Sequence, residues 1–244
     1  MTRNKKGSSL QSVLKNLRAD LKELTDKKKA VFLQRFFKTG PGEYGEGDIF
    51  IGLTVPQSRS LAIKYKDLTF PELVELLKSK IHEERLIALL ILVHRFDKFP
   101  NEERRIYEFY VKNLKYVNNW DLVDLSSHHI IGEYLLDKPK DILFELSRSE
   151  NLWERRIAMI STFSFIRDRK LDTSLKIAEL LVKDKEDLIQ KALGWMLREI
   201  GKKDLAIEEN FLKKYYKQMG RTALRYAIER FPEQKRLAYL HGGI

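Results

Sequence analysis

The sequence of 244 residues contains no cysteine. Disulfide bonds, a zinc site with cysteine ligands and a thiol nucleophile are therefore excluded, and the composition fits a reducing cytoplasm. The five histidines include no HExxH motif, and the adjacent His128 and His129 would point to different faces of a helix. We expect neither a metal site nor a cofactor.

A long hydrophobic run is also missing. No stretch of about 18 apolar residues occurs, so the sequence predicts no membrane-spanning helix and no membrane partner. The first residues, Met1 to Ser9, are basic and polar and lack the apolar segment of a signal peptide. Since 43% of the residues are apolar, the chain can bury a sizeable core. We expect a cytoplasmic monomer with a single domain over residues 1–244, in which residues 1–8 form a flexible basic tail.

Proline and glycine are scarce, with six and 12 residues, and most apolar residues recur at helical spacing. The exception is Gly40 to Asp48, which holds four glycines and a proline and is expected to be a loop that links two helices. No strand pair is predicted. We expect helices at residues 9–24, 27–38, 56–66, 71–79, 83–96, 101–114, 119–136, 139–147, 151–166, 171–183, 186–200, 204–218 and 221–230.

The sequence repeats itself along the chain. The segments ERLIA at Glu84 and ERRIA at Glu154 are closely similar and lie 70 positions apart. Half of that offset leads from Glu84 to NWDLV at Asn119, and a further step of 35 from Glu154 leads to IQKAL at Ile189. A period near 35 built from two helices is typical of an α-solenoid, in which each pair buries its apolar faces on its neighbours.

Charge of one sign dominates. Lys and Arg number 46 against 35 Asp and Glu, which gives a formal net charge of +11 and favours a polyanionic partner. Nucleic acid is the leading candidate for this partner, although anionic membranes and acidic proteins also attract a basic chain. In a solenoid, the helix starts near residues 84, 119, 154 and 189 would line one concave surface, where their N-termini could bind successive phosphates. A protein-binding scaffold is the alternative interpretation.

The segment NNWDLVD, from Asn118 to Asp124, joins an aromatic ring to two carboxylates at the start of a predicted helix. Trp120 and Asp124 are four residues apart, so they share one face and can act on one ligand. Either asparagine could cap the helix, and Asp121 suits the positive end of its dipole. Asp124 instead lies at the edge of the apolar stripe. A capped helix with a packing tryptophan is the purely structural interpretation.

Two later segments combine cations with rings. Arg156 lies among apolar neighbours on the helix that follows Asn151, as a snorkelling or paired arginine would. Trp195 has Lys191 at i−4 and Arg198 at i+3, so cations flank its ring. Aromatic rings interleaved with positive charge are typical of surfaces that bind nucleic acid.

The motifs NWDLVD, NLWERRIA and LIQKALGWMLRE, in this order, resemble the AlkD-type alkylpurine DNA glycosylases. The likeness spans roughly residues 30 to 232 and includes the segments GEYGEGDIFIGLTVP and ALRYAIERFP. The resemblance implies an all-α fold, a curved solenoid of HEAT-like two-helix repeats. It also implies a partner, double-stranded DNA with alkylated bases, from which purines alkylated at N3 or N7 are removed.

The family's pocket residues correspond to Trp120, Asp124, Arg156 and Trp195 in this sequence. A tyrosine often found on the second helix of the family aligns with Phe36, so the ring is kept without its hydroxyl. Asn119 replaces a tryptophan present in some relatives, which is expected to affect only capping or packing.

The roles follow from the residue types. Asp124 would stabilise the oxocarbenium-like sugar and position water, Trp120 and Trp195 would hold the cationic nucleoside, and Arg156 would hold a phosphate. Further DNA contacts are expected from Lys191, Arg198 and Phe36. The alternatives are a non-catalytic protein that binds DNA structures and a protein scaffold, and a scaffold would have no need of a carboxylate beside Trp120.

Overall fold

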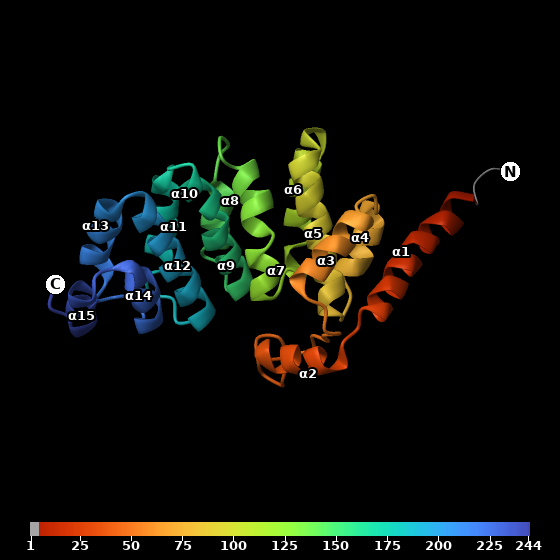
Figure 1. Cartoon of the computed structure of the whole chain (residues 1–244). Coiled ribbons are helices and arrows are strands. Elements are labelled where there is room, and N and C mark those ends of the chain that lie inside the picture. Colours follow the sequence, from red (N-terminus) through yellow and green to blue (C-terminus); the bar gives the residue numbers. More distant parts are fainter. Residues whose placement is uncertain (1–4) are drawn as a thin grey trace. The chain divides into compact units, whose positions relative to one another are not determined.

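The structure of the protein is a computed structural model that describes residues 5–244 (Figure 1). The chain divides into two compact units, Met1–Ser126 and Ser127–Ile244. The single domain expected from the sequence therefore stays a prediction. Residues 1–4 of the expected tail lie outside the described residues, and the first helix begins at Lys5.

The first unit is built from helices α1 to α7. Between residues 5 and 126 the structure has no strand and one isolated parallel bridge, Ile49 to Ile81. Short 3-10 turns occupy Pro100–Glu102 and Leu114–Tyr116. The helices are α1 (Lys5–Glu23), α2 (Lys27–Phe36), α3 (Val55–Lys64), α4 (Phe70–Leu77), α5 (His82–Lys98), α6 (Glu103–Lys112) and α7 (Trp120–Asp124).

Capping residues explain where several of these helices begin. Asp26 caps α2, since its carboxylate accepts hydrogen bonds from the amides of Lys28 at 3.0 Å and Lys29 at 3.1 Å. Thr54 and Thr69 form capping boxes at the starts of α3 and α4, and a proline follows each of them in the first turn. The core of the unit forms around α5, whose residues from His82 to Val93 are all buried. Helices α3, α4, α6 and α7 contact α5.

The second unit is organised around α12, which packs against α9, α11, α13 and α14. Gly194 permits the close approach of α14, because a Cβ there would lie 2.3 Å from the carbonyl oxygen of Ala223. The elements are a π-helical segment (His128–Gly132), α8 (Asp141–Leu146), α9 (Leu152–Ser161), α10 (Phe163–Arg167), α11 (Leu171–Leu181), α12 (Asp187–Lys203), α13 (Leu205–Tyr215), α14 (Arg221–Ala227), a 3-10 turn (Ile228–Arg230) and α15 (Glu233–His241).

The all-α prediction is confirmed for the described residues, and the repeat is visible in where helices begin. Helices α5, α7, α9 and α12 start at His82, Trp120, Leu152 and Asp187, close to the expected 84, 119, 154 and 189. Within each unit, helices that follow one another pack in pairs, such as α4 with α5 and α11 with α12.

Two predicted helices are interrupted in the structure, and helical structure resumes at the π-helical segment His128–Gly132 in the first and at α10 in the second. The helix expected over 119–136 ends as α7 at Asp124, where the hydroxyl of Ser126 donates to the carbonyl of Leu122 and competes with the helical ladder. The helix expected over 151–166 is interrupted at Thr162, whose hydroxyl donates to the carbonyl of Met159 at 2.7 Å. Helix α15 was not predicted. It follows Pro232 and is capped at its end by Gly242, which is in the left-handed conformation with φ of 76°.

Candidate active site

Helix α7 presents Trp120 and Asp124 one turn apart, as their spacing predicted, and both side chains are half-buried. Of the two candidate caps, Asn119 is the one used, since its side-chain oxygen accepts from the amide of Trp120 at 2.8 Å. Asn119 is fully buried. Asn119 therefore caps the helix that bears the two candidate residues.

The ring of Trp120 is held by aromatic residues from the end of α2. Phe37 is buried and stacks on it in parallel, with centroids 4.9 Å apart and an angle of 6°. Phe36 meets the same ring edge-on at 6.0 Å. The structure thus places Phe36 beside Trp120, and Phe37 closes one face of the indole to any ligand.

The stack continues away from Trp120 into the core. Phe50 lies on Phe37 at 4.6 Å, and the ring of His82, on α5, lies on Phe50 at 4.3 Å. Sequence reasoning did not single out Phe37, Phe50 or His82, because they come from three segments that only the fold brings together. The ring series therefore connects the candidate site to α5.

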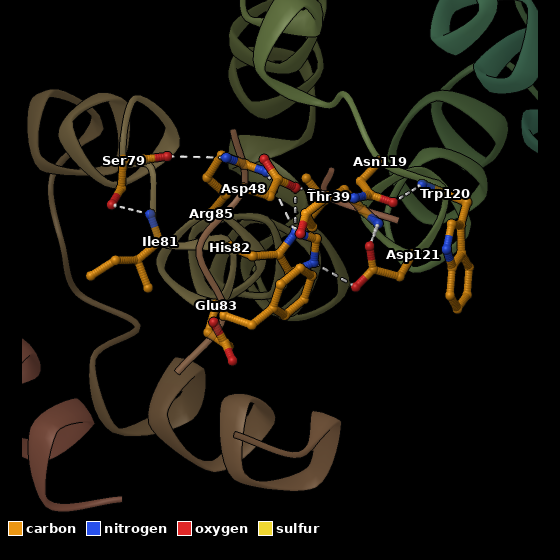
Figure 2. Close-up of polar contacts among 12 residues, drawn as sticks. Thr39, Asp48, Ser79, Ile81, His82, Glu83, Arg85, Asn119, Trp120 and Asp121 are labelled. Carbon is orange, nitrogen blue, oxygen red and sulfur yellow. Dashed lines mark hydrogen bonds and ion pairs between the residues drawn. The ribbon is translucent and has the colours of Figure 1, made fainter. Parts of the chain in front are cut away.

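His82 is buried between two carboxylates (Figure 2). Its Nε2 lies 2.7 Å from Oδ2 of Asp121, and its Nδ1 lies 3.1 Å from Oδ2 of Asp48. Burial alone would lower the pKa of His82, but the charge of Asp121 and the hydrogen bonds to both carboxylates outweigh it and raise this pKa to about 9. His82 is therefore a cation at neutral pH, and both ring nitrogens donate.

Asp48, at the end of the glycine-rich loop, gathers three donors at one oxygen (Figure 2). Besides His82, Arg85 approaches Oδ2 at 2.7 Å and the amide of Asn119 donates to it at 3.0 Å. Burial opposes ionisation of Asp48, yet the hydrogen bonds from His82 and Arg85 prevail and lower its pKa. The carboxylate of Asp48 thus ties the loop to α5 and to the cap of α7.

The exit of the same loop is fixed by Glu83. Its carboxylate accepts from the backbone amide of Gly52 at 2.8 Å and from the amides of Ile51 and Leu53. Gly52 has a φ of 93°, and a Cβ there would lie 2.2 Å from the carbonyl oxygen of Asp26. The segment expected to be a linker is therefore a brace that holds α2, α5 and the start of α7 in one arrangement.

Asp124 occupies the last position of α7. Its negative charge acts on Tyr110, a buried residue of α6 whose hydroxyl is bonded to Ser126 at 2.7 Å. Burial, more than the charge of Asp124, raises the pKa of Tyr110, so the phenol stays neutral. A charged carboxylate beside a neutral phenol and a half-exposed indole is an arrangement that can stabilise positive charge on a ligand.

In the second unit, Arg156 lies on α9 and is only 5% exposed. Its Nη1 donates to the backbone carbonyl of Leu188 in the first turn of α12. The sequence left open a snorkelling or a paired arginine. The structure shows a guanidinium that is buried and hydrogen-bonded. Arg156 therefore fixes the start of α12 as well as bringing a positive charge to this end of the helix.

Trp195, Lys191 and Arg198 all belong to α12. The indole nitrogen of Trp195 donates to Glu199 at 3.2 Å, and the ring lies 6.1 Å from that of Phe163. Lys191 pairs with Asp187 at 2.7 Å, and Arg198 pairs with Glu229. The sequence analysis did not identify the carboxylates that pair with Lys191 and Arg198. Asp187 lies one turn away on α12, and Glu229 lies in the 3-10 turn after α14.

The structure thus brings Phe36, Trp120 and Asp124 together in the first unit. Arg156 and the three α12 residues lie on two packed helices of the second unit. In the described part of the chain, no cluster of three or more histidine and acidic side chains is placed to hold a metal ion. None of the described helices is long and apolar enough to cross a membrane.

Comparison with known proteins identifies a family and a similar fold. The family described as DNA alkylation repair enzyme matches residues 17–231. The fold is similar to that of a solved structure described as a predicted DNA alkylation repair enzyme from Enterococcus faecalis, with a TM-score of 0.66 and 18% identity over 86% of this chain and 97% of that one. No curated protein sequence matches the chain.

The match of the family over most of the chain shows that this protein belongs to the DNA alkylation repair enzyme family. Its membership supports a role in DNA repair and in binding DNA.

Proposed function

We propose that the protein is a monofunctional DNA glycosylase that hydrolyses the N-glycosidic bond of cationic purines, alkylated at N3 or N7, in double-stranded DNA. The observation that favours this function is on α7. A carboxylate, Asp124, stands one turn from a half-buried indole, Trp120, one face of which is stacked on Phe37.

The chemistry needs little from the protein, because an alkylated purine already bears a positive charge. When the bond between C1′ and the base nitrogen breaks, its electron pair goes to the base, which leaves neutral without a general acid. The sugar is left with oxocarbenium character. Asp124 stabilises this cation electrostatically and orients the water whose oxygen bonds to C1′ and whose proton is lost to the carboxylate or to solvent.

Each unit supplies its own contacts to the duplex. In the first unit Trp120 offers a ring face to the cationic nucleoside and Phe36 an aromatic edge. In the second unit we assign a further aromatic contact to Trp195 and phosphate contacts to Arg156, Lys191 and Arg198. The net charge of +11 supports such contacts. We propose that the protein acts as a monomer on chromosomal DNA in the cytoplasm and that no lysine forms a Schiff base, so the DNA strand stays intact.

The second candidate is a DNA-binding protein without catalytic activity. It is favoured by Phe36, which lacks the hydroxyl of the family's frequent tyrosine. A pure protein scaffold fits less well, since it has no use for a half-buried Asp124 beside Trp120.

The experiment that separates these functions is incubation of the protein with methylated duplex DNA, followed by chromatography of the released material. The glycosylase predicts free N3-methyladenine or N7-methylguanine together with abasic, unbroken strands. Binding of the duplex with no release above the spontaneous rate would instead identify the non-catalytic DNA-binding protein.

A further inference from the structure

Helix α2 exposes two large rings, of which only Phe36 has a part in the proposed function. Phe32 is 65% exposed and Phe36 is 53% exposed. The two side chains are one turn apart, and their rings lie nearly parallel with centroids 5.9 Å apart. Since Phe36 also meets Trp120 edge-on, the pair extends the aromatic surface of the candidate site along α2.

Positive charge surrounds this pair. Lys28 and Arg35, both exposed, stand four residues before and three residues after Phe32, so they share its side of the helix. Lys27 and Lys38, at the two ends of α2, are exposed as well. The nearest carboxylate along the chain, that of Asp26, is occupied in capping the helix and in pairing with Lys29.

This combination selects among possible ligands. Exposed neighbouring rings are costly to leave in water and mark interaction sites. Rings that alternate with cations suit a ligand that has flat apolar faces joined by anionic groups, which describes unstacked nucleotides. A base inside a duplex cannot offer its face, so a nucleotide that stacks here must have left its pair.

We propose that Phe32 and Phe36 form a stacking platform for an unpaired nucleobase of the bound DNA, while Lys28 and Arg35 contact the phosphates on either side. This inference rests on the proposed function, because it concerns the same DNA. It adds a substrate preference: the protein favours sites where pairing is already disturbed over intact duplex.

The test uses DNA that contains no lesion, so that binding is measured without any excision. One duplex holds a single unpaired 2-aminopurine and the other is fully paired, and affinity is measured by fluorescence anisotropy. The wild type should bind the first duplex about tenfold more tightly, which is the size of effect expected from one base stacked on a ring. The fluorescence of 2-aminopurine should fall on binding, because stacking quenches it.

Variants then separate stacking from other contacts. Phe32→Ala and Phe32→Leu should both lose about tenfold in affinity for the unpaired site and leave binding of the paired duplex unchanged, because neither offers a ring face. Phe32→Tyr should keep the preference. Ile63→Ala, which removes another exposed apolar side chain of the same unit, is the matched control and should match the wild type. Circular dichroism checks that each variant is folded.

Several outcomes would overturn the platform. They are an absence of preference in the wild type, an equal loss on both duplexes, full retention by Phe32→Leu, and a Phe32-dependent binding of phosphatidylserine vesicles in place of DNA. The platform proposal and the glycosylase proposal can also be refuted independently of each other. Base release from methylated DNA without the preference refutes only the platform, and the preference without base release refutes only the glycosylase.

Discussion

Replacing the buried cation His82 by glutamine perturbs the brace that positions α7. In the wild type His82 is charged between Asp48 and Asp121, and Arg85 also neutralises Asp48. Removing the charge leaves Asp121 buried without its cation. Loss of one partner of a buried ion pair costs about 3 to 5 kcal/mol. The His82→Gln protein should therefore be less stable than the wild type by about 3 kcal/mol near neutral pH.

The pH dependence gives the same magnitude independently. The pKa of His82 is raised to about 9 in the folded protein, against about 6.5 in an unfolded chain. A raised pKa means that the stabilisation is complete below about pH 6.5 and is lost as the pH rises through about 9. At 1.36 kcal/mol per unit of pKa, the difference amounts to about 3 kcal/mol.

The assay is urea unfolding followed by circular dichroism at a series of pH values between about 6 and 10. The free-energy difference between wild type and His82→Gln should be largest at the acidic end and shrink by about 3 kcal/mol toward the alkaline end. Taking the difference removes the contribution of Glu208, whose pKa burial raises to about 8 in both proteins. A difference that stays constant with pH would refute a charged His82.

Other predictions concern DNA contacts, the brace and the site. Duplex affinity should fall steeply with salt and depend little on sequence, and Lys191→Ala should reduce the slope of log K against log salt by about one; a flat titration would mean that the cations are ordinary surface. Gly52→Ala should destabilise the protein by about 2 kcal/mol or more in urea unfolding, because φ is 93° and the added methyl would meet the carbonyl of Asp26; a neutral effect would show that the brace yields easily. Trp120→Ala and Trp195→Ala should each slow base release, but by less than loss of the Asp124 charge, because each removes part of the contact with the cation. Uracil and hypoxanthine, which are neutral, should not be released from duplexes by the wild type, and their release would show that an acid protonates the base.

The sequence predicted the helical architecture because its signals are local. Hydrophobic periodicity and a near-35-residue offset located α5, α7, α9 and α12 within a few residues. Helix ends were less predictable. Whether the hydroxyls of Ser126 and Thr162 donate to a backbone carbonyl depends on the folded environment. The sequence of residues 119–136 therefore does not distinguish a continuous helix from a broken one.

The candidate site was predictable where its residues share a helix and unpredictable where it depends on tertiary contacts. Trp120 and Asp124 follow from i, i+4 spacing, and the position of Phe36 followed from a resemblance to a family. Asp48 and His82 are 34 residues apart, and no spacing rule joins them. Near Trp195 the sequence suggested more than the structure shows. Lys191 and Arg198 pair with carboxylates, so a count of cations overstated the free positive charge there.

The most direct test of the proposed mechanism is the single-turnover rate of base release from methylated duplex DNA by the wild type and by Asp124→Asn. The substitution keeps nearly the same volume and removes the negative charge, so the rate should fall by about 10²-fold or more while DNA affinity stays nearly unchanged. Asp97→Asn makes the same chemical change at an exposed position of α5 and should react at the wild-type rate. Equal rates for wild type and Asp124→Asn would contradict the assignment of the chemical step to this carboxylate.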